Sequence, residues 1–238
     1  MICRPLLELA DHFFTAGDLE LRADDREWTA VAERLGLTVE HVLLIRQVHR
    51  ADAAVVRRGR TGRWDRPDAD AIVSNDPSSA VGVRVADCAP ILLVDRRLGA
   101  VGAVHAGWRG TLQEAAAAGV EAMTREFGSD AKDLVAAIGP CLGPCCGEVG
   151  PEVVEAFREA GHGADRIERW FATGPSGRPY LDLWRANADE LEAAGVEAGN
   201  IHVAGLCTKT HAGVLHSYRA EGEKSGRMLG VIRPKANH

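Results

Sequence analysis

The sequence predicts a mixed α/β (α+β) fold, organised as a single domain over residues 1–238 with a mixed sheet flanked by helices. Segments with helical periodicity alternate with short runs of β-branched residues, and no internal repeat or low-complexity tract interrupts them. The chain has 238 residues, of which 46% are hydrophobic and 26% are charged. This is the composition of a globular protein that can bury a substantial core.

Four segments carry apolar residues at helical spacing, and Pro151 and Gly161 suit the first turn and the stop of one of them. The predicted helices are 27–36, 111–128, 151–161 and 181–195. Short apolar runs edged by Gly, Pro, Asp or Asn predict strands at 41–48, 70–75, 79–86, 90–95, 99–105, 133–139 and 200–207. The polar stretch 161–179 is expected to be a loop or flap.

Charge and segment composition limit the partners that we expect. The chain has 28 basic and 34 acidic residues, a net charge of -6, and no long run of one sign, so nucleic acid is not expected to bind. Residues 1–14 lack a basic region followed by an unbroken apolar stretch, and no later segment is long enough to span a bilayer. We therefore expect a cytoplasmic protein with no membrane partner, either a monomer or a small homo-oligomer.

Two neighbouring strands bring a cysteine and a histidine together. A brief turn separates 90–95 from 99–105, which predicts an antiparallel hairpin with Asp95 near Ala100 and Ile91 near Val104. Cys88 and His105 would then be close in space at the open end of this hairpin.

Thiolate and imidazole are both good zinc ligands, and a third protein donor would leave one position open for water or substrate. His49, at the end of the predicted strand 41–48, is the best candidate for that donor. Spacing alone also allows the alternative that Cys88 is a small buried apolar residue and that each histidine is simply hydrogen-bonded.

Other polar residues are candidates for contacts around this centre. Arg109 could bind phosphate or a ribose hydroxyl beside a helix N-terminus, or form a surface ion pair. Asp87 could accept a hydrogen bond from an imidazole N–H, or cap a strand end. His216, Ser217 and Arg219 could reach the substrate.

The six cysteines are expected to be thiols or metal ligands, because no secretory signal accompanies them. No CxxC pair is present, which disfavours a zinc ribbon or a thioredoxin-like redox centre. Cys141, Cys145 and Cys146 have the density of a second metal site. The Gly- and Pro-rich sequence around them instead favours a tight turn that lines the pocket.

A series of motifs resembles the YfiH-like, laccase-domain (polyphenol oxidase) family, in the order in which that family has them. They are RQVH (46–49), DADAIVSNDP (68–77), VRVADCAPILLVD (83–95), AVHAGWRGT (103–111), AAIGPCLGPCCGEVG (136–150) and HSYRAEGEKSGRMLGVI (216–232). The resemblance implies that the metal ligands and catalytic residues are His49, Cys88 and His105. It also implies a fold similar to the catalytic domain of cytotoxic necrotizing factor.

The activity that the resemblance implies is zinc-dependent purine nucleoside phosphorylase. Adenosine, inosine or guanosine would react with phosphate to give the base and ribose 1-phosphate, with adenosine deamination and methylthioadenosine phosphorolysis as associated activities. The chain departs from the family at AGDLELRADDREWTA (16–30), where a glycine-rich, Arg-containing run is expected. Altered nucleoside preference with intact metal binding is the expected consequence.

Three other functions stay open at this stage. A copper-dependent polyphenol oxidase (laccase) would use copper in place of zinc, but the paired HxH motifs of multicopper oxidases are absent from the nine histidines. A cysteine amidase or hydrolase acting on cell-wall precursors would use Cys88 as nucleophile and His105 as base. An inactive metal-binding homologue is the third alternative.

Overall fold

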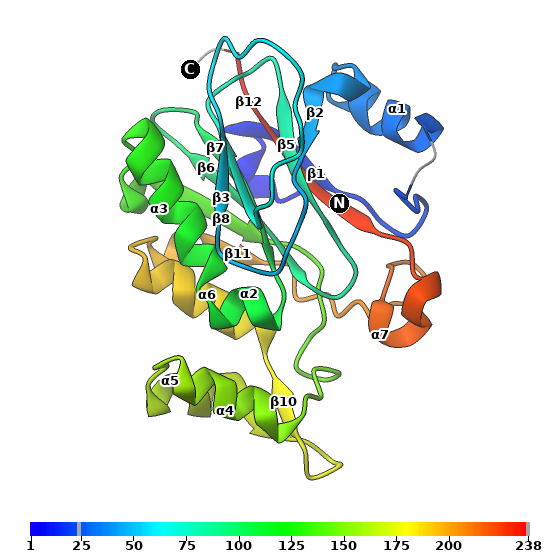
Figure 1. Cartoon of the computed structure of the whole chain (residues 1–238), viewed down its shortest axis with the longest axis vertical. Coiled ribbons are helices and arrows are strands. Elements are labelled where there is room, and N and C mark those ends of the chain that lie inside the picture. The colour runs from blue at the N-terminus through cyan, green and yellow to red at the C-terminus, as the bar shows by residue number, and fades with distance from the viewer. Residues whose placement is uncertain (23–24, 237–238) are drawn as a thin grey trace.

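The computed structural model describes residues 1–22 and 25–236, and it confirms a mixed α/β fold (Figure 1). The strands form two main sheets where one was expected. In spatial order the six-stranded sheet contains β11 (Ile201–Val203), β8 (Leu134–Ile138), β6 (Ala89–Asp95), β7 (Val101–Ala106), β4 (Ala71–Ser74) and β3 (Ala53–Val56). The four-stranded sheet contains β1 (Ala10–Phe14), β12 (Met228–Pro234), β5 (Ala80–Val85) and β2 (Val42–Leu44).

Both sheets are mixed and they pack against each other. The pairs β3–β4, β8–β11 and β2–β5 are parallel, and the other pairs within these two sheets are antiparallel. Alternate residues of the strands point to opposite faces. In β6, Leu92 and Val94 belong to a core cluster that includes Val81 and Val83 of β5, so this cluster fills the space between the sheets.

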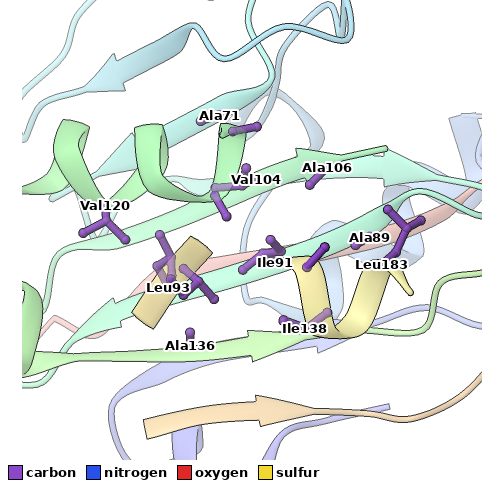
Figure 2. Close-up of a cluster of buried hydrophobic side chains, with 14 of the residues drawn as sticks. Ala71, Ala89, Ile91, Leu93, Val104, Ala106, Val120, Ala136, Ile138 and Leu183 are labelled. Carbon is purple, nitrogen blue, oxygen red and sulfur yellow. The ribbon is translucent and has the colours of Figure 1, made fainter. Parts of the chain in front are cut away.

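Helices cover the two outer faces and complete a four-layer α/β/β/α arrangement. On the four-stranded sheet, α1 (Asp25–Arg34) packs through Trp28 and Val31. On the six-stranded sheet, α3 (Ala115–Phe127) and α6 (Leu183–Ala193) bury the other side of β6, β7 and β8, as Figure 2 shows around Ile91 and Val104. Within residues 1–22 and 25–236, no helix is both long and apolar enough to cross a membrane.

Every predicted helix and strand overlaps an observed element, but the strands expected at 41–48 and 200–207 contain only three strand residues each, and β1, β3 and β12 were not predicted. The segment 111–128 was expected to be one helix, but α2 (Trp108–Leu112) ends before α3 begins. Glu114 lies between them with φ of 58°, a left-handed conformation that no continuous right-handed helix contains. Shorter elements are α7 (Tyr218–Glu221) and 3₁₀ turns at Arg4–Leu6, Val39–His41, Ala131–Asp133, Ala198–Asn200 and Gly222–Lys224.

The expectation of a loop at 161–179 was wrong for much of that stretch. It contains α5 (Ala164–Trp170) and β9 (Phe171–Thr173), and β9 pairs with β10 (Pro179–Leu181). Together with α4 (Pro151–Glu159), these elements form a lobe next to α6 (Figure 1). The lobe is ordered because Trp170 is fully buried. Its ring contacts Phe157, and its indole N–H donates to Asp189 Oδ2 at 2.9 Å.

Replacing Trp170 with Ala should therefore lower the free energy of unfolding by about 3–5 kcal/mol, because a large buried ring and its hydrogen bond are lost. Urea denaturation followed by circular dichroism measures this change. Glu168→Ala, at an exposed position of the same helix, is the control and should stay within about 0.5 kcal/mol of the unchanged protein. Equal unfolding midpoints for both variants would show that the buried Trp170 side chain contributes nothing to stability.

Candidate metal centre and substrate pocket

The hairpin predicted from the sequence is present and has the expected register. Ile91 is paired with Val104, and the amide of Asp95 donates to the carbonyl of Ala100 at 2.8 Å. Cys88 directly precedes β6. His105 lies within β7, opposite Pro90, one position further inside the pairing than expected.

His49 joins these two residues from the loop that follows β2. Its backbone is left-handed, with φ of 59°, a conformation that histidine adopts more readily than most side chains. The potential ligand atoms of His49, Cys88 and His105 all lie within 4.8 Å of one another, and the centroids of the two imidazole rings are 4.9 Å apart. The three residues that the sequence singled out are thus gathered at one point.

Asp70, directly before β4, positions the His105 ring and the backbone on either side of His49. Its Oδ1 accepts a hydrogen bond from His105 Nδ1 at 2.7 Å. Its Oδ2 accepts from the backbone amides of Val48 at 3.1 Å and Arg50 at 2.7 Å, on either side of His49. Because Nδ1 of His105 is engaged, Nε2 is the ring nitrogen that remains for the centre.

Asp70 therefore has one of the two roles that the sequence allowed for Asp87, that of acceptor for an imidazole N–H. The Asp87 carboxylate faces the C-terminal part of the chain, where it accepts from Thr208 Oγ1 at 2.5 Å, Ser217 Oγ at 2.7 Å and the Arg219 amide at 2.5 Å. Within the described residues, the hydrogen-bond partners of the Asp87 carboxylate are thus two hydroxyls and a backbone amide, and none of them is an imidazole. Asp87 has φ of 82°, and these three bonds stabilise this uncommon backbone conformation beside Cys88.

The electrostatics of the cluster favour an ionised thiol. Burial opposes the charged form of Cys88, but the positive charge of His105 and hydrogen bonds from His105 and His49 outweigh burial and lower the pKa of Cys88 to about 6. Burial likewise opposes the charged form of His105, but the Cys88 thiolate and the Asp70 carboxylate raise the pKa of His105 to about 9. Without a metal, the pair is a thiolate and an imidazolium at neutral pH.

Gly107 leaves the space that this cluster occupies. A Cβ atom at Gly107 would lie 2.6 Å from Cys88 Sγ and 3.6 Å from His49 Cδ2. Any side chain there would displace the thiol. This is a steric reason for a glycine in the HAGWRG sequence, directly before α2.

A pocket of about 970 Å³ opens over the three residues. It is lined by two carboxylates, Asp87 and Glu223, and by six arginines: Arg22, Arg46, Arg84, Arg109, Arg219 and Arg227. Burial, with the positive charges of Arg66 and Arg227, lowers the pKa of Arg84. The pocket therefore carries an excess of positive charge that suits an anionic ligand.

The other residues predicted for substrate contacts differ in position. Arg109 lines the pocket, and its guanidinium lies 4.2 Å from the centre of the Trp108 ring. Arg219 also lines the pocket, although its side chain donates to the carbonyls of Cys146 and Glu148. The structure does not bring His216 into the pocket lining, and its Nε2 bonds to the Leu19 carbonyl at 2.9 Å.

Sequence reasoning missed several residues of this lining. Tyr218 presents a 51% exposed aromatic side chain at the pocket. Arg84 belongs to β5, and Arg227 directly precedes β12. Arg22 belongs to the divergent segment 16–30, so that segment still supplies a guanidinium to the pocket, whereas its residues 23 and 24 lie outside the described part of the chain.

The sequence of the chain is similar to a known family and to several named proteins. A family model described as "Multi-copper polyphenol oxidoreductase laccase" matches residues 14–235. "Adenosine deaminase RL5" from an unknown prokaryotic organism is 39% identical over 225 residues, which are 91% of this chain and 84% of that protein. "Purine nucleoside phosphorylase" of Bacteroides thetaiotaomicron is 39% identical over 163 residues, which are 68% of this chain and 60% of that protein.

Among solved structures, YlmD from Geobacillus stearothermophilus superposes with a TM-score of 0.83 at 27% sequence identity. The match covers 97% of this chain and 94% of that one, so it includes both sheets and the helices on their outer faces. The family model covers nearly the whole chain and the architecture is shared throughout. The chain therefore belongs to the YfiH-like laccase-domain family, as the order of its motifs indicates.

Proposed function

We propose that this chain is a zinc-dependent purine nucleoside phosphorylase that converts adenosine, inosine or guanosine and phosphate to the free base and ribose 1-phosphate. The observation that carries the proposal is the position of the His49, Cys88 and His105 donors in an arginine-lined pocket. A relative that is 39% identical bears the name purine nucleoside phosphorylase, which supports the same assignment.

The donor set suits zinc. Two imidazoles and a thiol that prefers the ionised form are borderline-soft ligands, and three protein donors leave a position for substrate or water. When bound, zinc would supply a Lewis acid that polarises a substrate oxygen or a phosphate oxygen. Asp70 would keep His105 in the tautomer that presents Nε2 to the ion.

The side chains of the pocket supply the remaining requirements of phosphorolysis. A phosphate oxygen must form a bond to the C1′ atom of the ribose while the glycosidic C–N bond breaks and its electron pair leaves with the base. Arg84 and Arg227 can hold the phosphate dianion through charge-assisted hydrogen bonds. The exposed ring of Tyr218 offers a face on which a purine can stack.

Adenosine deamination is a second candidate reaction of this pocket, because a relative that matches 91% of the chain is named an adenosine deaminase. Ammonia release from adenosine without added phosphate would identify this reaction. The oxidase alternative has less support. The described residues contain two groups of three potential metal ligands and only one of them includes histidine, so the trinuclear centre of a multicopper oxidase has no counterpart among them.

The hydrolase alternative rests on a specific observation. Cys88, His105 and Asp70 are linked in the manner of a nucleophile, a base and the carboxylate that orients the base. The same contacts serve a metal ligand and its supporting carboxylate. Metal dependence separates the two functions, since chelation would abolish the phosphorylase and spare the hydrolase.

Substituting a ligand should remove one equivalent of zinc. We expect Cys88→Ala and His105→Ala to lose that equivalent in dialysed protein, and Asp70→Asn to weaken zinc binding about 10- to 100-fold by releasing His105. Elemental analysis and competition with a chelator measure both effects. Cys3→Ala, at a thiol outside the cluster, is the matched control. Full zinc occupancy in Cys88→Ala would refute the ligand assignment.

Release of hypoxanthine from inosine should require inorganic phosphate. Arg84→Gln and Arg227→Gln should each raise the KM for phosphate about 10- to 100-fold, because a charge-assisted hydrogen bond contributes about 1.5–3 kcal/mol. Arg125→Gln, at an exposed position of α3 outside the pocket, is the control. Equal rates of base release with and without phosphate would exclude phosphorolysis.

Alkylation of Cys88 in metal-stripped protein should report its ionisation. The thiolate is present above its pKa of about 6 and disappears as the pH falls through that value, so the rate with iodoacetamide should be half-maximal near pH 6. His105→Gln should move this midpoint upward, because the positive partner is lost. Peptide mass spectrometry follows the residue, and zinc should protect it. A midpoint near the ordinary thiol pKa in the unchanged protein would contradict the ion pair.

A further inference from the structure

A second group of thiols lies outside the candidate centre. Cys145 and Cys146 lie in a turn after β8, and Cys207 follows β11. Their three sulfur atoms lie within 4.8 Å of one another, with Cys145 Sγ and Cys146 Sγ 3.7 Å apart. All three are free thiols.

This group of thiols shares only two members with the three cysteines that the sequence suggested as a second metal site. Cys141 was considered with Cys145 and Cys146, but it is fully buried and burial raises the pKa of its thiol well above the ordinary value. Cys207 takes its place, because the backbone of residue 141 pairs with that of residue 207 in a parallel bridge. The third thiol thus comes from a segment about 60 residues further along the chain, and only the fold brings it to the other two.

We propose that Cys145, Cys146 and Cys207 form a second cation site, selective for thiophilic d¹⁰ ions such as Zn²⁺ and Cd²⁺. A disulfide would use two of the three sulfurs, whereas a soft cation is bound by all three at once. Cys145 is exposed, so an ion can enter from solvent, and Cys207 is buried, which provides a ligand fixed by its surroundings.

The surroundings of Cys207 support a negative charge at this position. Burial opposes its ionisation, but hydrogen bonds from the backbone of Thr210 and Gly143 and from the Cys145 side chain lower the pKa of Cys207 to about 7. Burial and the same contact with Cys207 raise the pKa of Cys145 to about 12, so the first negative charge of the group belongs to Cys207. Only a glycine fits at position 143, because a Cβ atom there would lie 2.6 Å from the Trp184 ring and 3.1 Å from Cys207 Cβ. The turn therefore holds its backbone close to the sulfur atom of Cys207.

An ion at this site would join two segments that shape the substrate pocket. Leu142 and Gly147, which flank the two adjacent cysteines, line the pocket. Thr208, next to Cys207, donates to Asp87 beside Cys88. The proposed site is therefore structural: it would hold this wall of the pocket in place without contacting the substrate.

Cadmium titration of the reduced full chain tests the proposal, in a Cys88→Ala background that removes the thiolate of the first centre. One equivalent of Cd²⁺ should produce the ultraviolet sulfur-to-cadmium charge-transfer band, and Cys145→Ser/Cys146→Ser should abolish it. A large excess of Zn²⁺ should compete for the site and reduce the band, because thiolates prefer the softer cadmium ion. Cys3→Ser in the same background is the matched control and should keep the full band.

Three results would overturn the proposal. The first is the absence of a thiolate band in the Cys88→Ala protein, and the second is an undiminished band in the protein that also lacks Cys145 and Cys146. The third is a reduced protein that takes up no cadmium at this cluster and forms a disulfide there on mild oxidation, which would assign a redox pair. Circular dichroism of each variant verifies that it is folded, and the exposed Cys145→Ser alone provides a further variant if the double substitution unfolds the chain.

Discussion

The geometry of the candidate centre depends on one buried carboxylate. A carboxylate removed from water is stable only when its oxygens accept hydrogen bonds, and Asp70 satisfies this requirement with His105 Nδ1 and with the amides on both sides of His49. The bonds that satisfy Asp70 therefore fix a strand residue and a loop residue relative to each other. Because the His105 ring and the backbone on either side of His49 are already oriented, a metal could bind with little rearrangement.

Local pattern was sufficient to predict part of this site. Two short strands and a brief turn determine the register of the β6–β7 hairpin, and that register brings Cys88 close to His105. Asp70 could not be found in this way, because it is 35 residues from His105 and reaches it through the pairing of β4 with β7. Asp87 was expected instead because it is adjacent to Cys88, but adjacency along a chain does not determine where a side chain points.

The fold was predicted less completely for a related reason. Strand β12 occupies an interior position only because it pairs with β1 on one side and β5 on the other, and no local signal identified β1 or β12. The interior strands β6 and β7 are buried on both faces, so their apolar composition indicates burial without indicating which sheet contains them. In 161–179 polar residues surround a few apolar ones, and the docking of Trp170 overrides that local polarity.

The position of β12 also determines an order of events during synthesis. Strands β1 and β5 lack their shared neighbour until residues 228–234 have left the ribosome. The pairings around His105 need only β4, β6 and β7, all complete by residue 106. All three candidate metal ligands are therefore synthesised, together with the strand pairings around His105, well before Arg219 and Arg227 can complete the pocket.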